Sequence, residues 1–208
     1  YDPAARRFTL ACRQNRSPGG RPREFPFRFA LADADGRDIA ERTVRIAGEE
    51  EEVVIDDVDR PAFLSLNRGY SFYGKVVYRP PEDELYLQAA KDADIVGRFT
   101  AFNALAGHEM LRLLEDPGAA VSSRFADLCA GLLADDALME EAGGQFLTIF
   151  PAVDDERFAH RYRALHDARK KILAAVGARH ADTLLAVYRQ AAVDLPSGDG
   201  YLEDEARA

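Results

Sequence analysis

The residues of this chain whose types and spacing could do chemistry begin with GHEML, residues 107–111. His108 and Glu109 match the first two positions of H-E-x-x-H, in which two histidines on one helical face bind zinc and the glutamate acts as general base. Arg112 holds the position of the second histidine. A guanidinium stays protonated and has no lone pair to give a metal, so the sequence predicts no zinc site here.

The other histidines form no metal-binding pattern either. His160 and His166 are six positions apart, which places them on different faces of a helix, and no carboxylates complete a site around them. They and His180 are interpreted as exposed or capping residues. Met110 and Met139 are interpreted as core residues.

Nucleophile and phosphate motifs are also missing. Ser65 and Ser71 have no partners for a triad, and SPGG and SGDG lack the lysine of a phosphate-binding loop. Glu49–Glu52 is interpreted as a solvated hairpin corner, and Phe25, Phe27 and Phe29 as sandwich core. We therefore predict no catalytic, cofactor-binding or metal-binding residue in this chain.

Composition bounds the class of protein. The 208 residues are 47% hydrophobic and 30% charged, as in soluble globular proteins. No apolar run approaches the ~20 residues of a membrane span, so we expect no membrane partner. Cys12 and Cys129 have no disulfide or zinc-ribbon spacing, and we expect reduced thiols in the cytoplasm. Because the chain starts at Tyr1 rather than Met, we expect a piece of a longer protein.

Charge is unevenly distributed along the chain. Residues 1–81 carry a net charge of +1, and residues 82–208 carry 13 basic and 23 acidic side chains, a balance of −10. An acidic second half argues against a nucleic-acid partner, because the phosphates would be repelled.

Up to Tyr78 the apolar residues alternate, which is typical of strands. Phe8, Leu10 and Cys12 share one face of a strand, and Phe25, Phe27, Phe29 and Leu31 share another. DADGRD, residues 33–38, predicts a hairpin turn. Further strands are predicted at 42–48 and 51–58, paired around the acidic corner, and at 63–69 and 73–79. About seven short strands predict an immunoglobulin-like antiparallel β-sandwich in residues 1–80.

After Pro80 and Pro81 the apolar spacing becomes helical. Helices are predicted at 82–92, 94–106, 108–115, 119–134, 137–148, 155–177 and 179–192, with breaks near Asp116, Asp135, Pro151 and Gly177. We predict a multi-domain β-then-α chain, in which residues 82–208 form a solenoid-like α-helical cap domain truncated at its C-terminal end.

Residues 56–78, DDVDRPAFLSLNRGYSFYGKVVY, resemble a segment of bacterial aminopeptidase N, a gluzincin zinc metallopeptidase. The matching positions are Val58, Arg60, Pro61, Ser65, Leu66, Arg68, Gly69, Ser71 and Lys75. The resemblance extends upstream to FTLACRQN and FPFRFALADADGRDI and downstream to GLLADDALMEE, FLTIFPAVDDERF and LHDARKKILAAVGARHADTLLAVYR. It departs at Phe72-Tyr73-Gly74, where the family has Ala-Pro, and at Gly143-Gly144, two glycines inside an expected helix.

The resemblance implies that the chain covers the third, β-sandwich domain and the first part of the helical C-terminal domain. The parent enzyme would remove N-terminal amino acids from peptides with alanyl or broad specificity, using zinc held by H-E-x-x-H in an upstream catalytic domain. That domain would be the partner of this chain, which would be inactive alone. The sandwich would act as a spacer and the helical part would roof the catalytic cleft. His108-Glu109 would be a coincidence at the start of a cap-domain helix.

Two other interpretations stay open at this point. The chain could be a free-standing protein-interaction module, with a sandwich and a helical solenoid that bind a protein partner. It could also be a standalone hydrolase that uses His108, His160 or His166.

Overall fold

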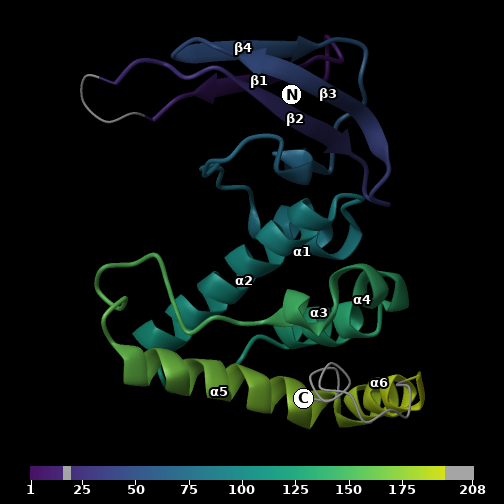
Figure 1. Ribbon diagram of the computed structural model, residues 1–208, viewed down its shortest axis with the longest axis vertical. Helices are drawn as coiled ribbons and strands as arrows, with labels where there is room; N and C mark the ends of the chain where they lie inside the picture. Colours follow the sequence, from purple (N-terminus) through teal and green to yellow (C-terminus); the bar gives the residue numbers. More distant parts are fainter. Residues whose placement is uncertain (16–19, 195–208) are drawn as a thin grey trace, which may run out of the picture. The chain divides into compact units, whose positions relative to one another are not determined.

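The computed structural model describes residues 1–15 and 20–194 (Figure 1). The chain forms two compact units, Tyr1–Leu105 and a second that begins at Ala106. The last strand ends at Leu66, and the first α-helix begins at Glu82, directly after the two prolines where the sequence predicts it. The units divide further along, within a helix.

The first unit contains two antiparallel sheets. One pairs β1 (Phe8–Arg13) with β4 (Glu50–Ile55), and the other has the order β3 (Asp38–Ile46), β2 (Phe25–Ala32), β5 (Phe63–Leu66). Apolar side chains from both sheets, with Val58 from the connection after β4, form one core: Phe8, Phe27, Phe29, Leu31, Ile46, Ile55, Val58 and Leu64. Each such side chain contributes about 1.5–3 kcal/mol when fully buried. The predicted alternation in β1 and β2 is confirmed, and so is the immunoglobulin-like sandwich.

The predicted turn between β2 and β3 is also confirmed. The Asp33 carboxylate accepts hydrogen bonds from the backbone N–H groups of Asp35 at 2.8 Å and Arg37 at 2.9 Å. Gly36 has φ +84°, and a Cβ there would lie 2.0 Å from the carbonyl oxygen of Lys91. Glycine is therefore required both by the left-handed backbone and by the close approach of α1.

Two predictions about strands are wrong. β3 and β4 do not pair around the acidic corner: β4 pairs with β1, and Glu50–Glu52 lie within β4. Residues 73–79 form no strand, although their sequence favours one. Both errors concern pairing, which depends on strands distant in the sequence rather than on local alternation. The described residues contain five strands in place of about seven.

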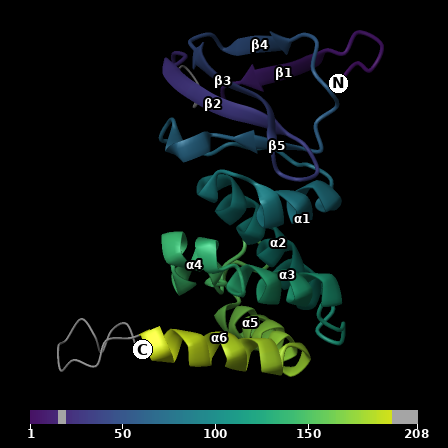
Figure 2. The ribbon, with the colours of Figure 1, turned by 90° about the vertical axis from the view of Figure 1, so that its right-hand side faces the viewer.

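Helix α1 (Glu82–Lys91) follows Pro81 and carries three acidic residues in its first turn, where they face the positive end of the helix dipole. It packs against β5, as Figure 2 shows. Leu64 of β5 belongs to the sandwich core, whereas Phe63 and Ser65 point to the opposite face of the sheet and are buried as well.

Helix α2 (Ile95–Glu115) is one continuous helix where the sequence predicts two, 94–106 and 108–115. Glycine inside a helix costs only about 1 kcal/mol relative to alanine, so Gly107 does not break it. His108 and Glu109 consequently lie inside α2 and not at the start of a helix.

The second unit continues with α3 (Ser123–Leu133), α4 (Asp136–Ala142), η2 (Gly144–Leu147), α5 (Tyr162–Arg179) and α6 (Ala181–Asp194). Ser122 and Asp135 cap α3 and α4 by accepting hydrogen bonds from Phe125 N–H and Leu138 N–H. Helix α3 contacts α4, α5, α6 and η2. Its buried side chains meet an apolar core that includes Met110, Leu113, Phe125, Leu132, Leu138, Phe146, Leu165 and Ile172.

Several predicted helix bounds need correction. The helix predicted at 119–134 begins only at Ser123, and that predicted at 137–148 is divided at Gly143, which has φ +68° and ends α4. Residues 155–161 lie outside α5, because Asp155 holds a turn by accepting from the N–H groups of Phe158 and Ala159. Helix α5 continues through Gly177 to Arg179, since Val176 is buried in the core.

In the part of the chain that the structure describes, we find no helix with the length and apolar character that crossing a membrane requires.

Candidate functional site

Glu109 is the residue of the GHEML stretch with the strongest contacts. Its neighbour His108 is exposed, whereas Glu109 is only 6% exposed. The Glu109 carboxylate accepts hydrogen bonds from Arg112 Nη2 at 2.6 Å and Nε at 3.1 Å, and from the backbone N–H of Ser122 at 2.8 Å. Arg112 also donates to the carbonyl oxygen of Ala120.

This arrangement gives Arg112 a structural role in place of the metal-binding role of a second histidine. The guanidinium and Glu109 form a charge-assisted pair at i, i+3, and together they hold the backbone of residues 120–122 against α2. Both carboxylate oxygens of Glu109 are occupied. The group is therefore placed to fasten the connection between α2 and α3, and not to accept a proton from a bound water.

The remaining histidines are not brought together. His160 and His166 are exposed. His180 Nε2 lies 2.7 Å from Asp127 Oδ1, and Arg179 donates to the same carboxylate. The hydrogen bond from Arg179 is the main cause that lowers the pKa of Asp127. Among residues 1–15 and 20–194, no three His, Cys, Asp or Glu side chains gather into a group that could hold a metal ion.

A cluster of charged side chains surrounds Arg68, a residue for which the sequence suggested no role beyond the family resemblance. Arg68 is 5% exposed and donates to Asp38 through both terminal nitrogens, to Ser65 Oγ at 2.8 Å and to Asp92 at 3.2 Å. Asp92 follows the last residue of α1, is fully buried, and also accepts from Gln88 Nε2 at 3.0 Å.

The Arg68 cluster joins three elements of the first unit: β3, the end of β5 and α1. The cluster is tightly packed beside Gly97, because a Cβ there would lie 2.1 Å from Asp92 Oδ2. Within the described residues, no buried side-chain nitrogen or oxygen lacks a hydrogen-bond partner. The cluster is therefore a closed structural joint, since all of its buried charges are compensated from within the chain.

Other candidates named from the sequence have structural roles. Glu51 accepts from the N–H groups of Gly48 and Ala47, and these bonds lower its pKa. Cys12 and Cys129 are free thiols, and burial raises the pKa of Cys129 to about 12. A thiol with that pKa carries almost no thiolate at neutral pH, so it is not a nucleophile.

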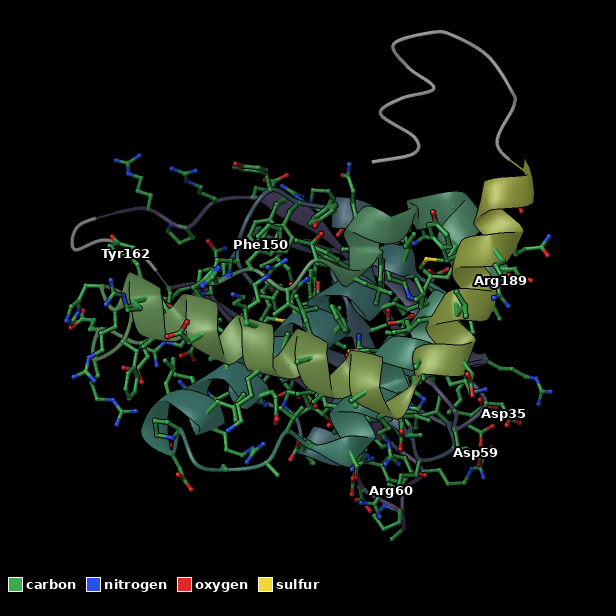
Figure 3. The ribbon with its side chains drawn as sticks, turned by 90° about the horizontal axis from the view of Figure 1, so that it is seen from below. Asp35, Asp59, Arg60, Phe150, Tyr162 and Arg189 are labelled. Carbon is green, nitrogen blue, oxygen red and sulfur yellow. The ribbon has the colours of Figure 1, made fainter. Side chains whose placement is uncertain are left out.

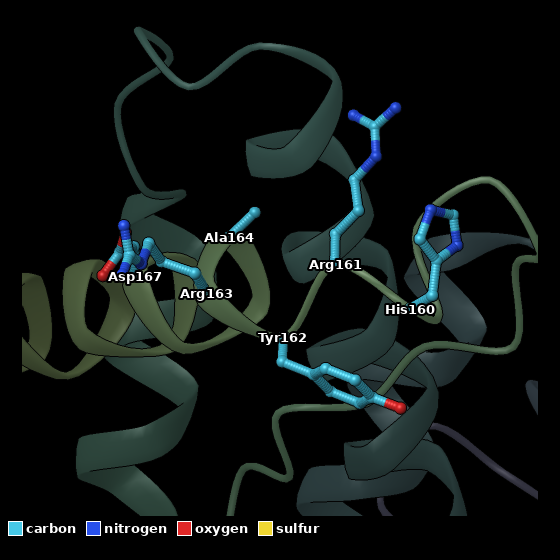
Figure 4. A pocket seen from close by; sticks show the side chains of 6 residues that line it. All are labelled: His160, Arg161, Tyr162, Arg163, Ala164 and Asp167. Carbon is cyan, nitrogen blue, oxygen red and sulfur yellow. The ribbon is translucent and has the colours of Figure 1, made fainter.

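An open hollow of about 540 Å³ lies at the beginning of α5 and is lined by His160–Ala164 and Asp167 (Figure 4). Figure 3 shows Tyr162 at the start of α5 and Arg189 on α6. The Arg161 guanidinium lies over the ring of Phe158, 5.3 Å from its centroid, which is within the range of a cation–π contact. The lining side chains are exposed, and no nucleophile and base converge there.

Models of known protein families match both parts of the chain. The family model of an Ig-like domain of unknown function, DUF3458, matches residues 1–79. A second family model, DUF3458_C, described as ARM repeats, matches residues 82–201.

Among solved structures, the chain is similar to Legionella pneumophila aminopeptidase A, whose crystal structure was determined in complex with aspartic acid. The TM-score is 0.74 at 19% sequence identity, and the match covers 99% of this chain and 25% of that protein. This chain thus spans about a quarter of the length of the solved relative.

At this identity the structural likeness shows the fold alone, whereas the two family models match consecutive parts of the sequence. The sequence resemblance is confirmed: the chain belongs to the family of this ARM-repeat domain and joins it to the Ig-like domain, the C-terminal pair of domains of aminopeptidase N.

Proposed function

We propose that this chain is the non-catalytic C-terminal portion of a zinc-dependent aminopeptidase that removes N-terminal amino acids from peptides. The observation that carries the proposal is the consecutive match of the Ig-like and ARM-repeat family models to residues 1–79 and 82–201. The fold shared with a quarter of an aminopeptidase supports it.

The residues described here do not fit a zinc ion, because no three donors gather and Glu109 is held by Arg112 and Ser122. We therefore assign zinc and the peptide-cleaving chemistry to a separate catalytic domain of the same protein. That domain is the partner of this chain, and peptides are the substrate of the assembly. The two free thiols support a cytoplasmic location.

Each unit has a proposed part in that assembly. The sandwich, with two sheets on one apolar core, acts as a rigid spacer. The amphipathic helices roof the catalytic cleft, limit access to peptides and exclude bulk water. The balance of −10 in residues 82–208 would favour substrates with a positively charged amino end.

The test is hydrolysis of alanine p-nitroanilide with added zinc. It is measured for this chain alone and for this chain joined to the coding region that precedes it in its gene. We expect no activity from the chain alone and activity from the joined protein. A His108→Ala variant of the joined protein is the matched control, since His108 is exposed and should not affect activity.

The outcomes separate the three interpretations of the sequence. Activity of the chain alone that is lost in His108→Ala would identify a standalone hydrolase. Inactivity of both proteins would contradict the proposal and favour a protein-interaction module. A joined protein whose kcat/KM for alanine p-nitroanilide does not change with salt would contradict the role given to the acidic charge.

A further inference from the structure

Residues 73–79, here called the 73–79 segment, expose several apolar side chains to solvent. Tyr73 is fully exposed and Val77 is 66% exposed. Valine and tyrosine favour strands, and the sequence predicts one here, yet the segment belongs to no strand or helix. An exposed apolar stretch that lies outside the strands and helices is typical of an interaction surface.

The start of the segment is held firmly by the sandwich. Asn67 Oδ1 accepts from Ser71 Oγ at 3.0 Å and from Phe72 N–H at 3.1 Å, and Ser71 Oγ accepts from the N–H of Arg28 at 2.9 Å. The Phe72 ring packs on Phe25, with 4.5 Å between ring centroids. These contacts tie the residues just before Tyr73 to β2.

The backbone before the segment also adopts a costly conformation. Asn67, Gly69 and Tyr70 have φ values of 56°, 58° and 52°. For residues other than glycine this region is unfavourable, so it persists only where the surroundings enforce it. Asp94 contributes by accepting from Gly69 N–H at 3.0 Å.

The end of the segment is held by Glu84 of α1. Tyr78 donates its hydroxyl hydrogen to Glu84 Oε1 at 3.1 Å, and the same oxygen accepts from the N–H of Leu64 at 3.1 Å. The segment is thus held at both ends while Tyr73, Val76 and Val77 face solvent. A surface ordered before binding loses little conformational entropy on binding, which favours affinity.

We propose that the 73–79 segment is the docking surface through which this chain binds the catalytic domain of the same protein. This inference rests on the proposed function. The solved relative carries the matching fold in 25% of its chain, so three-quarters of that protein lies outside the match and provides a body against which the segment can be buried. Tyrosine is among the residues enriched at the positions that contribute most to the binding energy of protein interfaces.

A second copy of this chain is a less favourable binding partner for the 73–79 segment than the catalytic domain. Arg79, at the end of the segment, is positively charged and exposed. A two-fold self-interface brings the same patch of both copies together, so the two Arg79 charges would approach one another. The expected partner surface is apolar, with a carboxylate at its rim that would face Arg79.

Hydrogen–deuterium exchange of the backbone amides of Val76, Val77 and Tyr78 tests the inference. These amides are compared in the chain alone and in the protein joined to its preceding coding region. We expect exchange at least about tenfold slower in the joined protein, because docking would bury the segment. The double variant Tyr73→Ser, Val77→Ser should lose this protection, whereas Tyr188→Ser should keep it, as Tyr188 is equally accessible on α6, at 70% exposed.

Aminopeptidase activity of the joined protein reports separately on the proposed function. Activity without slower exchange would overturn the docking surface and leave the function intact. Inactivity with added zinc would overturn the proposed function, and the docking partner with it. Protection that arises in the chain alone and grows with its concentration would assign the segment to a second copy and overturn the inference.

Discussion

Arg68 and Asp38, separated by 30 positions in the sequence, form a two-point ion pair in which both nitrogen–oxygen distances are 2.7 Å. Asp38 begins β3, and Arg68 follows β5. Because Arg68 also donates to Asp92 at the end of α1, one guanidinium joins the three-stranded sheet to the first helix.

Removal of Arg68 should therefore destabilise the first unit strongly. Arg68→Ala would leave the fully buried Asp92 without its countercharge, and we expect a loss of about 3–5 kcal/mol in the free energy of unfolding. Urea denaturation measures this. Arg45→Ala is the control, because Arg45 and its partner Glu24 are exposed, and it should cost far less than Arg68→Ala. Equal losses in the two variants would contradict the structural role of Arg68.

Glu109 should matter for stability and not for metal binding. Glu109→Ala leaves Arg112 and Ser122 N–H without their acceptor, and we expect a loss of about 1–3 kcal/mol in the free energy of unfolding. His108→Ala should change it by less than about 0.5 kcal/mol, since His108 is exposed. Added zinc or EDTA should leave the melting temperature of this chain unchanged. A zinc-dependent rise that Glu109→Ala abolishes would restore the metal-site interpretation.

The two cysteines should differ in reactivity. Burial raises the pKa of Cys129 to about 12, and the nearby Glu109 charge adds to the rise. In the native chain at pH 8, Ellman's reagent should label at most one thiol, and Cys12→Ser should remove that labelling. In urea both thiols should react. Fast labelling of native Cys12→Ser would show that Cys129 is accessible.

The hydroxyl group of Tyr78 should lose its proton at a higher pH than an ordinary tyrosine. Burial raises its pKa from 10.0 to about 12, with further contributions from the charge and the hydrogen bond of Glu84. Because the folded-state pKa lies above the unfolded one, the stability contributed by this group is fully present below pH 10 and is lost as the pH rises toward 12.

Absorbance titration of tyrosinate measures this pKa, and Tyr78→Phe identifies the group. Glu84→Gln should lower the pKa of Tyr78 but leave it above 10.0, because burial is the largest cause of the rise. A pKa of Tyr78 near 10.0 in the native chain would show that the end of the 73–79 segment is not held by Glu84.

Local patterns in the sequence were sufficient for much of the fold. Alternation in Phe8–Cys12 and Phe25–Leu31, the Asp33–Asp38 turn and the change at Pro80–Pro81 all appear in the structure as predicted. Each depends on residues close in the chain, through side-chain alternation, turn geometry or the missing N–H of proline. The prediction that no zinc binds at His108 and Glu109 rests on the chemistry of one side chain, Arg112, and stays a prediction.

The tertiary structure alone decided the pairing of β4 with β1, the closed cluster around Arg68 and the placement of the 73–79 segment outside any strand. Periodicity shows that a segment favours a strand, but not which strand it meets. Partners such as Asp38 and Arg68 are brought together only when the whole unit packs. Strand pairing and buried ion pairs are contacts between residues distant in the sequence, so their energies depend on the folded chain and leave no local pattern.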